Sequence, residues 1–280
     1  MNKTILTVAF AAMLGANAYA QNPLSDLSVS GTIDWESQYV YRAKKITNNA
    51  FQPKAEFGYP VFGGSLYAGV WTNQPIGRRT NAGGPDQADE IDLYGGYAYP
   101  LDALVKGLSL DVGDTYYWYP EAGGTANALD RSDEIFVGVT YDTSSVLSYN
   151  LSPSVYYYYD FILNQSVVEF SLKYTWDMSN MTGVKGLSLT PRAYVGWLDS
   201  LRQRGDQLNA GAPNWRNSYS YWGVTLDLNY KINDFTTAFV GFRYAGNNDG
   251  NVFYPAFGTN SQGGGTDENV WAGVGLKFSK

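Results

Sequence analysis

Polar and apolar residues alternate with a period of two along most of the chain, which is typical of β-strands. Between residues 28 and 42, for example, most odd positions are apolar or aromatic and most even positions are polar or charged. Eleven further segments show a similar alternation. We therefore expect twelve strands, at residues 28–42, 50–60, 65–74, 89–99, 107–119, 133–142, 146–160, 166–176, 187–199, 217–232, 235–245 and 268–278.

The predicted strands are long. Each has at least ten residues, whereas strands of soluble proteins average about 5–6 residues and a tilted strand needs ~9–11 to cross a bilayer. A secreted β-sandwich with an inward aromatic face is the alternative, because alternation does not say which face is outside. Aromatic pairs near strand ends are typical of the interfacial girdles of a transmembrane barrel. These pairs are Tyr39/Tyr41, Tyr97/Tyr99, Tyr116/Trp118, Tyr157/Tyr159 and Tyr174/Trp176.

The connections between the strands favour the barrel. A barrel with both termini in the periplasm has short turns on that side and long loops outside the cell. The pattern therefore predicts an all-β fold, an up-and-down antiparallel transmembrane barrel of about 12 strands. The odd connections are the longer set, at 43–49, 75–88, 120–132, 161–165, 200–216 and 246–267, and the even ones lie at 61–64, 100–106, 143–145, 177–186 and 233–234.

Two strands leave their orientation open. Both faces of the segment 65–74 are acceptable to lipid. In the segment 107–119, an outward face that carries Leu108, Leu110 and Val112 also carries Asp114, and a carboxylate that faces lipid is costly. A β-bulge at Gly113 would swap the faces and turn Thr115, Tyr117 and Tyr119 outward.

The first twenty residues have the composition of a secretory signal peptide. Lys3 precedes a short apolar run, and Ala18-Tyr19-Ala20 is a cleavage signal of small residues. About a dozen apolar residues are too few for a membrane-spanning helix, which needs ~20. We expect residues 1–20 to be cleaved during export and residues 21–280 to form a single barrel in the outer membrane of a Gram-negative cell.

The composition excludes many reactions. The 280 residues include no cysteine and no histidine, so the chain has no thiolate nucleophile, no imidazole base and no histidine-based zinc motif. We expect no enzymatic activity, no catalytic residue, no cofactor and no metal. The net charge of −7 also argues against binding to nucleic acid.

Two pairs of carboxylates are candidates for glycosidase or metal chemistry: Asp34/Glu36 and Glu90/Asp92. Residues two apart on a strand share one face, and the polar face of a barrel strand faces water in the lumen. The lining of a lumen therefore explains these pairs better than an active site does.

The chain also resembles a known family. The segments SGTIDWESQYVYRAKKITNNAFQPKAEFGYP, LYAGVWTNQP, DEIDLYGGYAYPL and LDVGDTYYWYP resemble the TorF-like porins of Gram-negative outer membranes. The resemblance implies an outer-membrane β-barrel with pore activity and no catalytic residues. For a barrel of this kind we expect contact with outer-membrane lipid, lipopolysaccharide and the assembly machinery. Many outer-membrane proteins end in Phe as an assembly signal, whereas here Phe278 is followed by Ser279 and Lys280.

The charges on the polar faces are unevenly distributed along the chain. The resulting hypothesis is a porin-like channel for passive diffusion of small polar solutes, with an acidic wall, a basic wall and a mild preference for cations. The alternative is a non-conducting structural or adhesive barrel, in which pairs such as Glu36 with Lys54 or Glu169 with Lys173 plug the lumen. The first six strands carry Asp34, Glu36, Glu56, Glu90, Asp92, Asp111 and Glu134 against Arg42 and Lys54, and the last six carry Glu169 and Asp227 against Lys173, Arg192, Lys231, Arg243 and Lys277.

Overall fold

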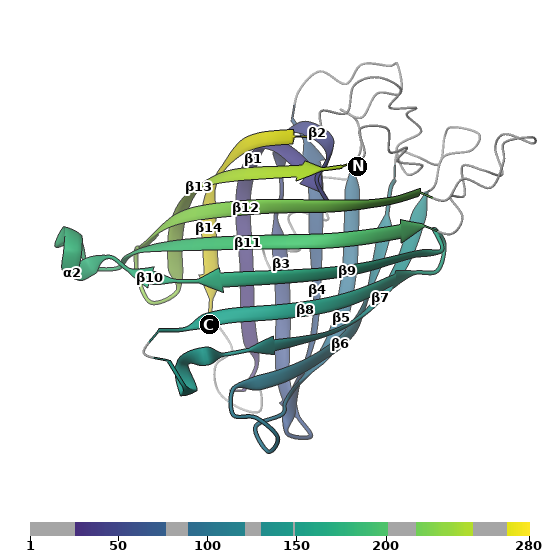
Figure 1. Ribbon diagram of the computed structural model, residues 1–280. Coiled ribbons are helices and arrows are strands. Elements are labelled where there is room, and N and C mark those ends of the chain that lie inside the picture. Colours follow the sequence, from purple (N-terminus) through teal and green to yellow (C-terminus); the bar gives the residue numbers. More distant parts are fainter. Residues whose placement is uncertain (1–25, 77–88, 121–129, 148, 201–216, 249–267) are drawn as a thin grey trace, which may run out of the picture.

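The computed structural model describes residues 26–76, 89–120, 130–147, 149–200, 217–248 and 268–280, most of which lie in β-strands (Figure 1). The predicted signal peptide and the central parts of the longest predicted loops lie outside the described residues. The described residues include two short helical turns, η3 (Thr143–Ser145) and α2 (Ser179–Thr182). The strands are β1 (Ser28–Tyr41), β2 (Lys44–Phe51), β3 (Lys54–Val61), β4 (Gly64–Pro75), β5 (Glu90–Pro100), β6 (Leu108–Trp118), β7 (Arg131–Tyr141), β8 (Leu151–Asp160), β9 (Gln165–Tyr174), β10 (Trp176–Asp177), β11 (Leu187–Ser200), β12 (Asn217–Lys231), β13 (Thr236–Asn247) and β14 (Glu268–Ser279).

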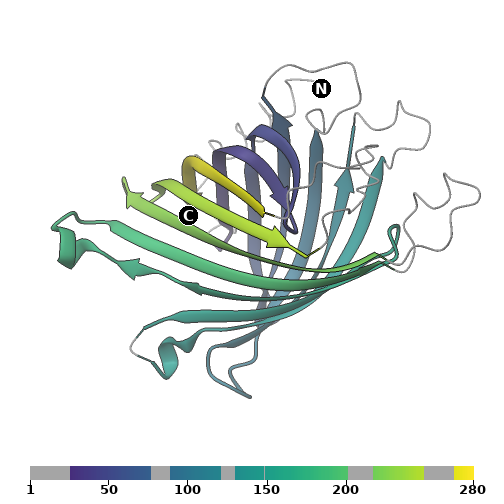
Figure 2. The same ribbon diagram turned by 45° about the horizontal axis from the view of Figure 1, so that its top comes forward.

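The strands form a closed antiparallel barrel. Each pairs with its neighbours in sequence, and the first and last strands pair with each other, with Trp35 of β1 opposite Val274 of β14. The segment β3 continues β2 after Gln52 and Pro53, and β10 continues β9. Counted this way, twelve strands surround the lumen (Figures 1 and 2). The predicted fold is confirmed.

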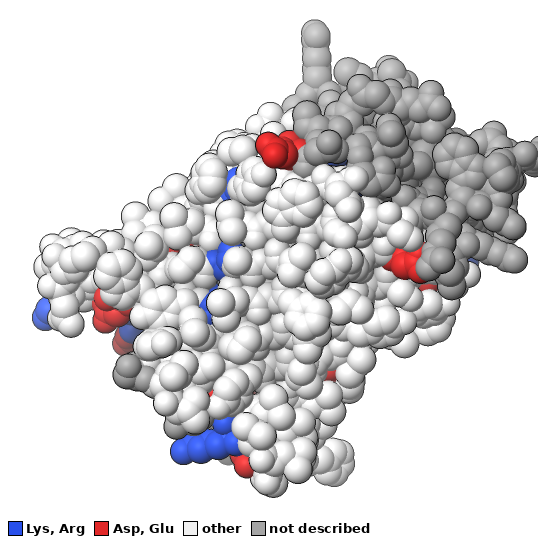
Figure 3. Space-filling view, viewed as in Figure 1, with Lys and Arg blue, Asp and Glu red and all other residues white. Residues whose placement is uncertain are grey.

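The outer face of the barrel is apolar. Alternate residues of the strands leave large hydrophobic side chains exposed, and the surface over the strands in Figure 3 carries few charged groups. Within the described residues, no helix is long and apolar enough to span a membrane. Exposed residues of the outer face include Leu93, Val112, Val137, Phe170, Leu172, Val195, Leu226, Val240, Phe242 and Val274.

The structure decides the faces of the two ambiguous strands. In β4, Leu66 is exposed on the outer face, whereas Tyr67 on the inner face donates a hydrogen bond to Asp111 of β6. In β6, the pairing with β5 and β7 runs through Gly113 without a shift. The alternative of a bulge at Gly113 is therefore excluded, and the face that carries Leu108, Leu110 and Val112 is the outer one. As a result Tyr117 and Tyr119 are buried inside, and Asp114 is exposed on the outer face.

Tyrosine rings lie over glycines on the inner face. A Cβ atom added at Gly138 would overlap the ring of Tyr156 on the neighbouring strand, and one added at Gly196 would overlap Tyr221. The glycines therefore make room for rings that lie flat along the wall. Their hydroxyl groups donate to carboxylates of the lumen, as Tyr156 does to Asp111 at 3.0 Å. Similar ring-over-glycine contacts join Tyr94 with Gly69, Tyr67 with Gly96 and Tyr194 with Gly223.

The connections divide between the two ends of the barrel. The connections at 62–63, 101–107, 142–150, 178–186 and 232–235 lie at the end that carries α2 (Figure 1). The connections that follow β4, β6, β8, β11 and β13 leave from the opposite end. The connections therefore alternate between the two ends as the sequence predicts. The first connection, however, is not the loop at 43–49 that the sequence predicts.

Candidate functional site

The first connection is a tight turn inside the barrel. The predicted loop at 43–49 is wrong, because β2 begins at Lys44 after a turn of only two residues, Arg42 and Ala43. Both have a left-handed backbone, with φ of 45° and 60°. We call residues 36–51 the lumenal hairpin, because its tip extends across the lumen and contacts strands on both sides. It bends over at the upper end of the barrel (Figures 1 and 2).

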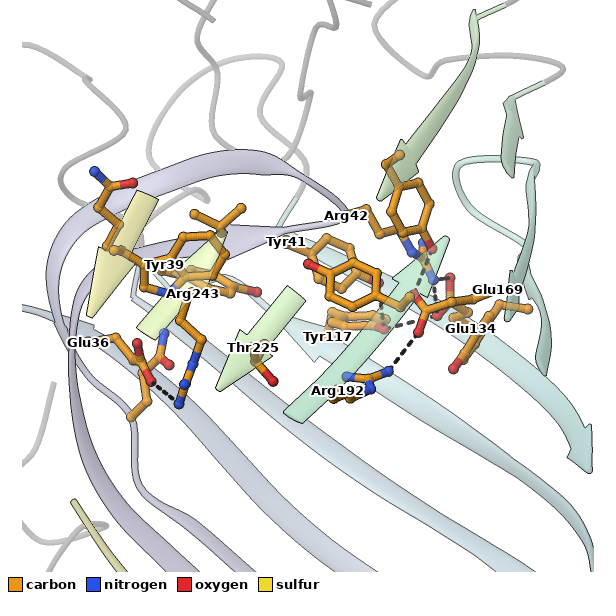
Figure 4. A pocket seen from close by; sticks show the side chains of 17 residues that line it. Glu36, Tyr39, Tyr41, Arg42, Tyr117, Glu134, Glu169, Arg192, Thr225 and Arg243 are labelled. Atoms are coloured by element: carbon orange, nitrogen blue, oxygen red, sulfur yellow. Dashed lines mark hydrogen bonds and ion pairs between the residues drawn. The ribbon is translucent and has the colours of Figure 1, made fainter. Parts of the chain in front are cut away.

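A buried ion pair holds the tip of the lumenal hairpin. The Nη2 atom of Arg42 donates to both carboxylate oxygens of Glu134 on β7, at 2.9 and 2.8 Å. Its Nη1 atom donates to Gln165 at the start of β9, at 3.3 Å. In the ring of strands β7 and β9 flank the strand opposite β1, so Arg42 reaches across the lumen. The hydroxyl of Tyr117 also donates to Glu134, at 3.0 Å (Figure 4).

The backbone of the turn binds the other wall. Its carbonyl groups cannot pair within the two-residue turn, and side chains of β12, β13 and β14 satisfy them. Asn247 donates to the carbonyl of Ala43 at 2.9 Å, and Asn269 donates to the same oxygen at 3.3 Å. The hydroxyl of Tyr219 donates to the carbonyl of Arg42 at 3.2 Å. The turn is therefore fixed from both sides of the lumen.

Apolar contacts pack both faces of the lumenal hairpin. On one face Tyr39 and Ile46 are buried together, and Tyr39 lies against Trp71 of β4 with ring centroids 5.3 Å apart. On the other face Ala43 joins a buried cluster that contains Tyr219 and Tyr221 of β12. The prediction that Tyr39 and Tyr41 belong to an outer aromatic girdle is therefore wrong. Members of the other four pairs, Tyr99, Trp118, Tyr157 and Trp176, are exposed on the outer face.

A cavity of about 360 Å³ lies against the lumenal hairpin inside the barrel. Its charged lining residues balance, because three glutamates face three arginines (Figure 4). Tyrosines from β6, β8, β11 and β12 supply much of the remaining lining. The charged residues are Glu36, Glu134, Glu169, Arg42, Arg192 and Arg243.

The charges of the lumen form ion pairs, but not the pairs expected from the sequence. Glu169 pairs with Arg192 at 2.9 Å instead of with Lys173. Glu36 pairs with Arg243 at 3.4 Å instead of with Lys54. Because β1 pairs with β14, the acidic strands at one end of the sequence meet basic strands at the other. The further pairs are Arg243 with Asp227, Lys277 with Asp227 at 3.1 Å, and Lys54 with Glu56 at 3.0 Å.

The other predicted lumen residues do not line this cavity. Asp34 lies on β1 opposite Gly275 of β14. Lys173 is exposed on the inner face of β9, opposite Arg192. Glu56 accepts a hydrogen bond from Tyr94, and Asp111 accepts from Tyr67 and Tyr156.

Of the two carboxylate pairs named from the sequence, Glu90/Asp92 is the more deeply buried. They are only 3% and 9% exposed, and neither lines the cavity. One oxygen of each, Oε2 of Glu90 and Oδ1 of Asp92, has no hydrogen-bond partner. Across the ranges that the structure describes, no three acidic, histidine or cysteine side chains are grouped so that they could hold a metal ion.

Sequence reasoning missed the tyrosines of the cavity, because it assigned aromatic residues to the outer girdles. Tyr158, Tyr194 and Tyr221 all line the cavity. One feature of the sequence does predict tyrosines inside the barrel. The segment 156–159 contains four consecutive tyrosines, and since side chains alternate along a strand, two of them must face the lumen.

Comparison with known proteins gives a family. Residues 20–206 match a family described as "Bacterial protein of unknown function (Gcw_chp)". The chain belongs to the Gcw_chp family. No match was found among curated proteins. The resemblance of this Gcw_chp chain to TorF-like porins stays a prediction.

The barrel is also similar to solved structures. One is described as "KdgM porin", with 10% identity over 90% of this chain and 99% of that chain, and a TM-score of 0.46. The NanC porin has 13% identity over 90% of this Gcw_chp chain and 98% of its own, with a TM-score of 0.48. LpxR from Salmonella typhimurium has 9% identity, 90% and 99% coverage, and a TM-score of 0.48.

Proposed function

We propose that this protein is a porin-like channel of the outer membrane, through which small polar solutes diffuse passively. The apolar outer face and the closed ring of strands support a position in a lipid bilayer, because a closed barrel satisfies its backbone hydrogen bonds between strands. The outer face of the barrel would then contact outer-membrane lipid and lipopolysaccharide. Insertion would depend on the outer-membrane assembly machinery.

The cavity against the lumenal hairpin is the observation that carries this proposal. Its volume of about 360 Å³ and its lining of ion pairs and tyrosine hydroxyls suit a small hydrated solute better than an apolar one. Barrels of about eight strands hold only side chains, whereas 16–18 strands leave an aqueous channel. In a barrel of intermediate size, the lumenal hairpin would set the width of the passage.

A non-conducting structural barrel is the second candidate, and the packing of the lumenal hairpin favours it. Apolar contacts seat the hairpin against both walls, and the Arg42–Glu134 ion pair crosses the lumen. In this case the hairpin is a permanent plug. We propose no catalytic role for either candidate, since the chain has no histidine or cysteine and the carboxylates of Glu56, Asp111 and Glu169 are bound by tyrosine or arginine side chains.

Liposome swelling distinguishes the two candidates. Purified protein is reconstituted into liposomes, which are then diluted into isotonic solutions of neutral sugars of increasing size. A narrow channel gives swelling with a pentose, less with a disaccharide and none with larger oligosaccharides. Protein boiled before reconstitution is the control. If folded protein gives no swelling with any sugar, the channel proposal fails and the structural barrel replaces it.

A further inference from the structure

Two ion pairs of the lumen are unequally buried, and in both the basic partner is nearer to water. The side chain of Arg192 is 41% exposed and that of its partner Glu169 is 19% exposed. Lys277 is 38% exposed against 16% for Asp227. These pairs therefore act as dipoles whose positive ends point toward the water of the lumen.

Arg192 differs from the other two arginines of the cavity. The guanidinium groups of Arg42 and Arg243 are almost completely buried, and each donates to two different side chains. Arg192 donates one hydrogen bond to another side chain, from Nη2 to Oε1 of Glu169 at 2.9 Å. A guanidinium carries five N–H donors. Most donors of Arg192 therefore remain open to the cavity (Figure 4).

The surroundings of Arg192 hold it in place and add positive charge. The second oxygen of Glu169, Oε2, accepts a hydrogen bond from Tyr221 at 2.9 Å, so the carboxylate is fixed from two sides. The guanidinium carbon lies 5.2 Å from the ring centroid of Tyr194. Lys173 stands opposite Arg192 in the pairing of β9 with β11 and is exposed on the same face.

We propose that Arg192 is the anion-binding contact of the lumen and that it recognises small solutes bearing a carboxylate. A planar guanidinium matches a carboxylate with two parallel hydrogen bonds. This inference rests on the proposed channel only in placing Arg192 on the path of a solute. Binding itself does not require conduction.

The same asymmetry reverses the selectivity that the formal charges suggest. A count of lumenal residues is acidic and predicts a mild preference for cations. Two members of that count, Glu90 and Asp92, are buried in the wall and are not exposed to the water of the lumen. A solute in the lumen meets the exposed ends of Arg192, Lys173 and Lys277 instead. The channel therefore favours anions.

Calorimetric titration of the folded barrel in detergent tests the binding site directly. The probe is succinate, and succinamide, which has the same skeleton without charge, is the matched control ligand. Succinate binds to the wild type at least tenfold more tightly than succinamide, because charge-assisted hydrogen bonds are stronger than neutral ones. Equal binding of the two ligands, or no binding of succinate, overturns the proposal without any variant.

Two variants locate the contact. Arg192→Gln removes the charge and lowers the affinity for succinate at least tenfold, whereas Arg192→Lys retains part of it. Lys185→Gln removes an equal charge from an exposed turn outside the barrel and leaves the affinity unchanged. A gel shift between unheated and boiled samples verifies that each variant is folded. If folded Arg192→Gln binds succinate as the wild type does, Arg192 is not the contact.

The reversal potential in a planar bilayer under a gradient of KCl separates this proposal from the proposed function. Anion selectivity that falls in Arg192→Gln and Lys173→Gln supports both. Cation selectivity in a conducting wild type overturns the inference and leaves the channel intact. Succinate binding at Arg192 in a protein that does not conduct overturns the channel and leaves the binding site.

Discussion

Arg42 and Glu134 form an ion pair across the lumen, with Nη2 of Arg42 2.8 Å from Oε2 of Glu134. Arg42 stands in the turn between β1 and β2, and Glu134 stands on β7, near the opposite side of the ring. Both side chains are almost completely buried. This pair fixes the tip of the lumenal hairpin, so its removal is expected to affect both the stability of the barrel and the width of the lumen.

Arg42→Ala is expected to lower the free energy of unfolding by about 3–5 kcal/mol, because it leaves the carboxylate of Glu134 buried without its charge partner. The measurement is unfolding by urea in detergent micelles. The double variant Arg42→Met/Glu134→Gln removes both charges and recovers most of the loss.

The control for this prediction is an exposed ion pair. Lys231 at the end of β12 pairs with Asp234 in the following turn at 2.7 Å, and exposed pairs of this kind contribute little to stability. Lys231→Ala should therefore change little. An Arg42→Ala variant no less stable than Lys231→Ala would show that the buried pair does not hold the hairpin.

Asp111 and Asp114 test the assignment of faces in β6. Asp111 faces the lumen and accepts hydrogen bonds from Tyr67 and Tyr156, whereas Asp114 is exposed on the outer face. In liposomes, Asp114→Leu should raise the free energy of unfolding by about 1–2 kcal/mol, since a carboxylate that faces lipid is unfavourable. Asp111→Leu should lower it by about 1–3 kcal/mol, since two hydroxyl donors lose their acceptor. The opposite signs would mean that the face of β6 is reversed.

Gly138 tests the contacts of tyrosine rings with glycines. An added Cβ would overlap the ring of Tyr156, so Gly138→Ala should lower the free energy of unfolding by about 1–3 kcal/mol. Gly95 is the matched position on the outer face, where the nearest atom to an added Cβ is the carbonyl oxygen of Tyr67 at 3.2 Å. Urea unfolding of Gly95→Ala should show a smaller loss, and equal losses would exclude the ring contact as the cause.

The sequence predicted the barrel because lipid outside and water inside impose the same alternation on every strand. It did not predict the lumenal hairpin, since Tyr39 and Tyr41 keep that alternation while their strand turns inward. The turn at Arg42 and Ala43 also lacks the Asn-Gly or Asp-Gly signal of a two-residue hairpin. The left-handed backbone at these two positions depends on hydrogen bonds from side chains of β12, β13 and β14. These strands are far away in the sequence, so the local sequence does not predict the turn.

The site itself could be predicted only in part. The alternation assigned Glu36, Glu134, Arg192 and Arg243 to the lumen, and the structure brings them to one cavity. The ion pairs depend on which strands lie side by side or across the ring. Arg243 reaches Glu36 because the first and last strands of the barrel, β1 and β14, lie side by side. The separation of the two residues in the sequence gives no indication of this contact.

Labelling of intact cells tests the orientation of the barrel. An epitope in the connection 201–216, for example at Asn209, or one after β13 at Asn248 should be exposed on the cell surface. An epitope at Asn180, in α2 at the opposite end, should bind antibody only after the outer membrane is permeabilised. The reverse pattern would invert the barrel.

The most direct test of a channel narrowed by the lumenal hairpin is single-channel conductance in a planar bilayer. Wild-type protein and the double variant Arg42→Gln/Glu134→Gln are compared, each checked for folding by its shift between unheated and boiled samples on a gel. We expect small discrete conductance steps from the wild type and larger steps from the variant, because the tip of the hairpin is no longer tied to β7. Folded protein that gives no steps in either form would contradict the channel, and equal steps would contradict the role of the hairpin.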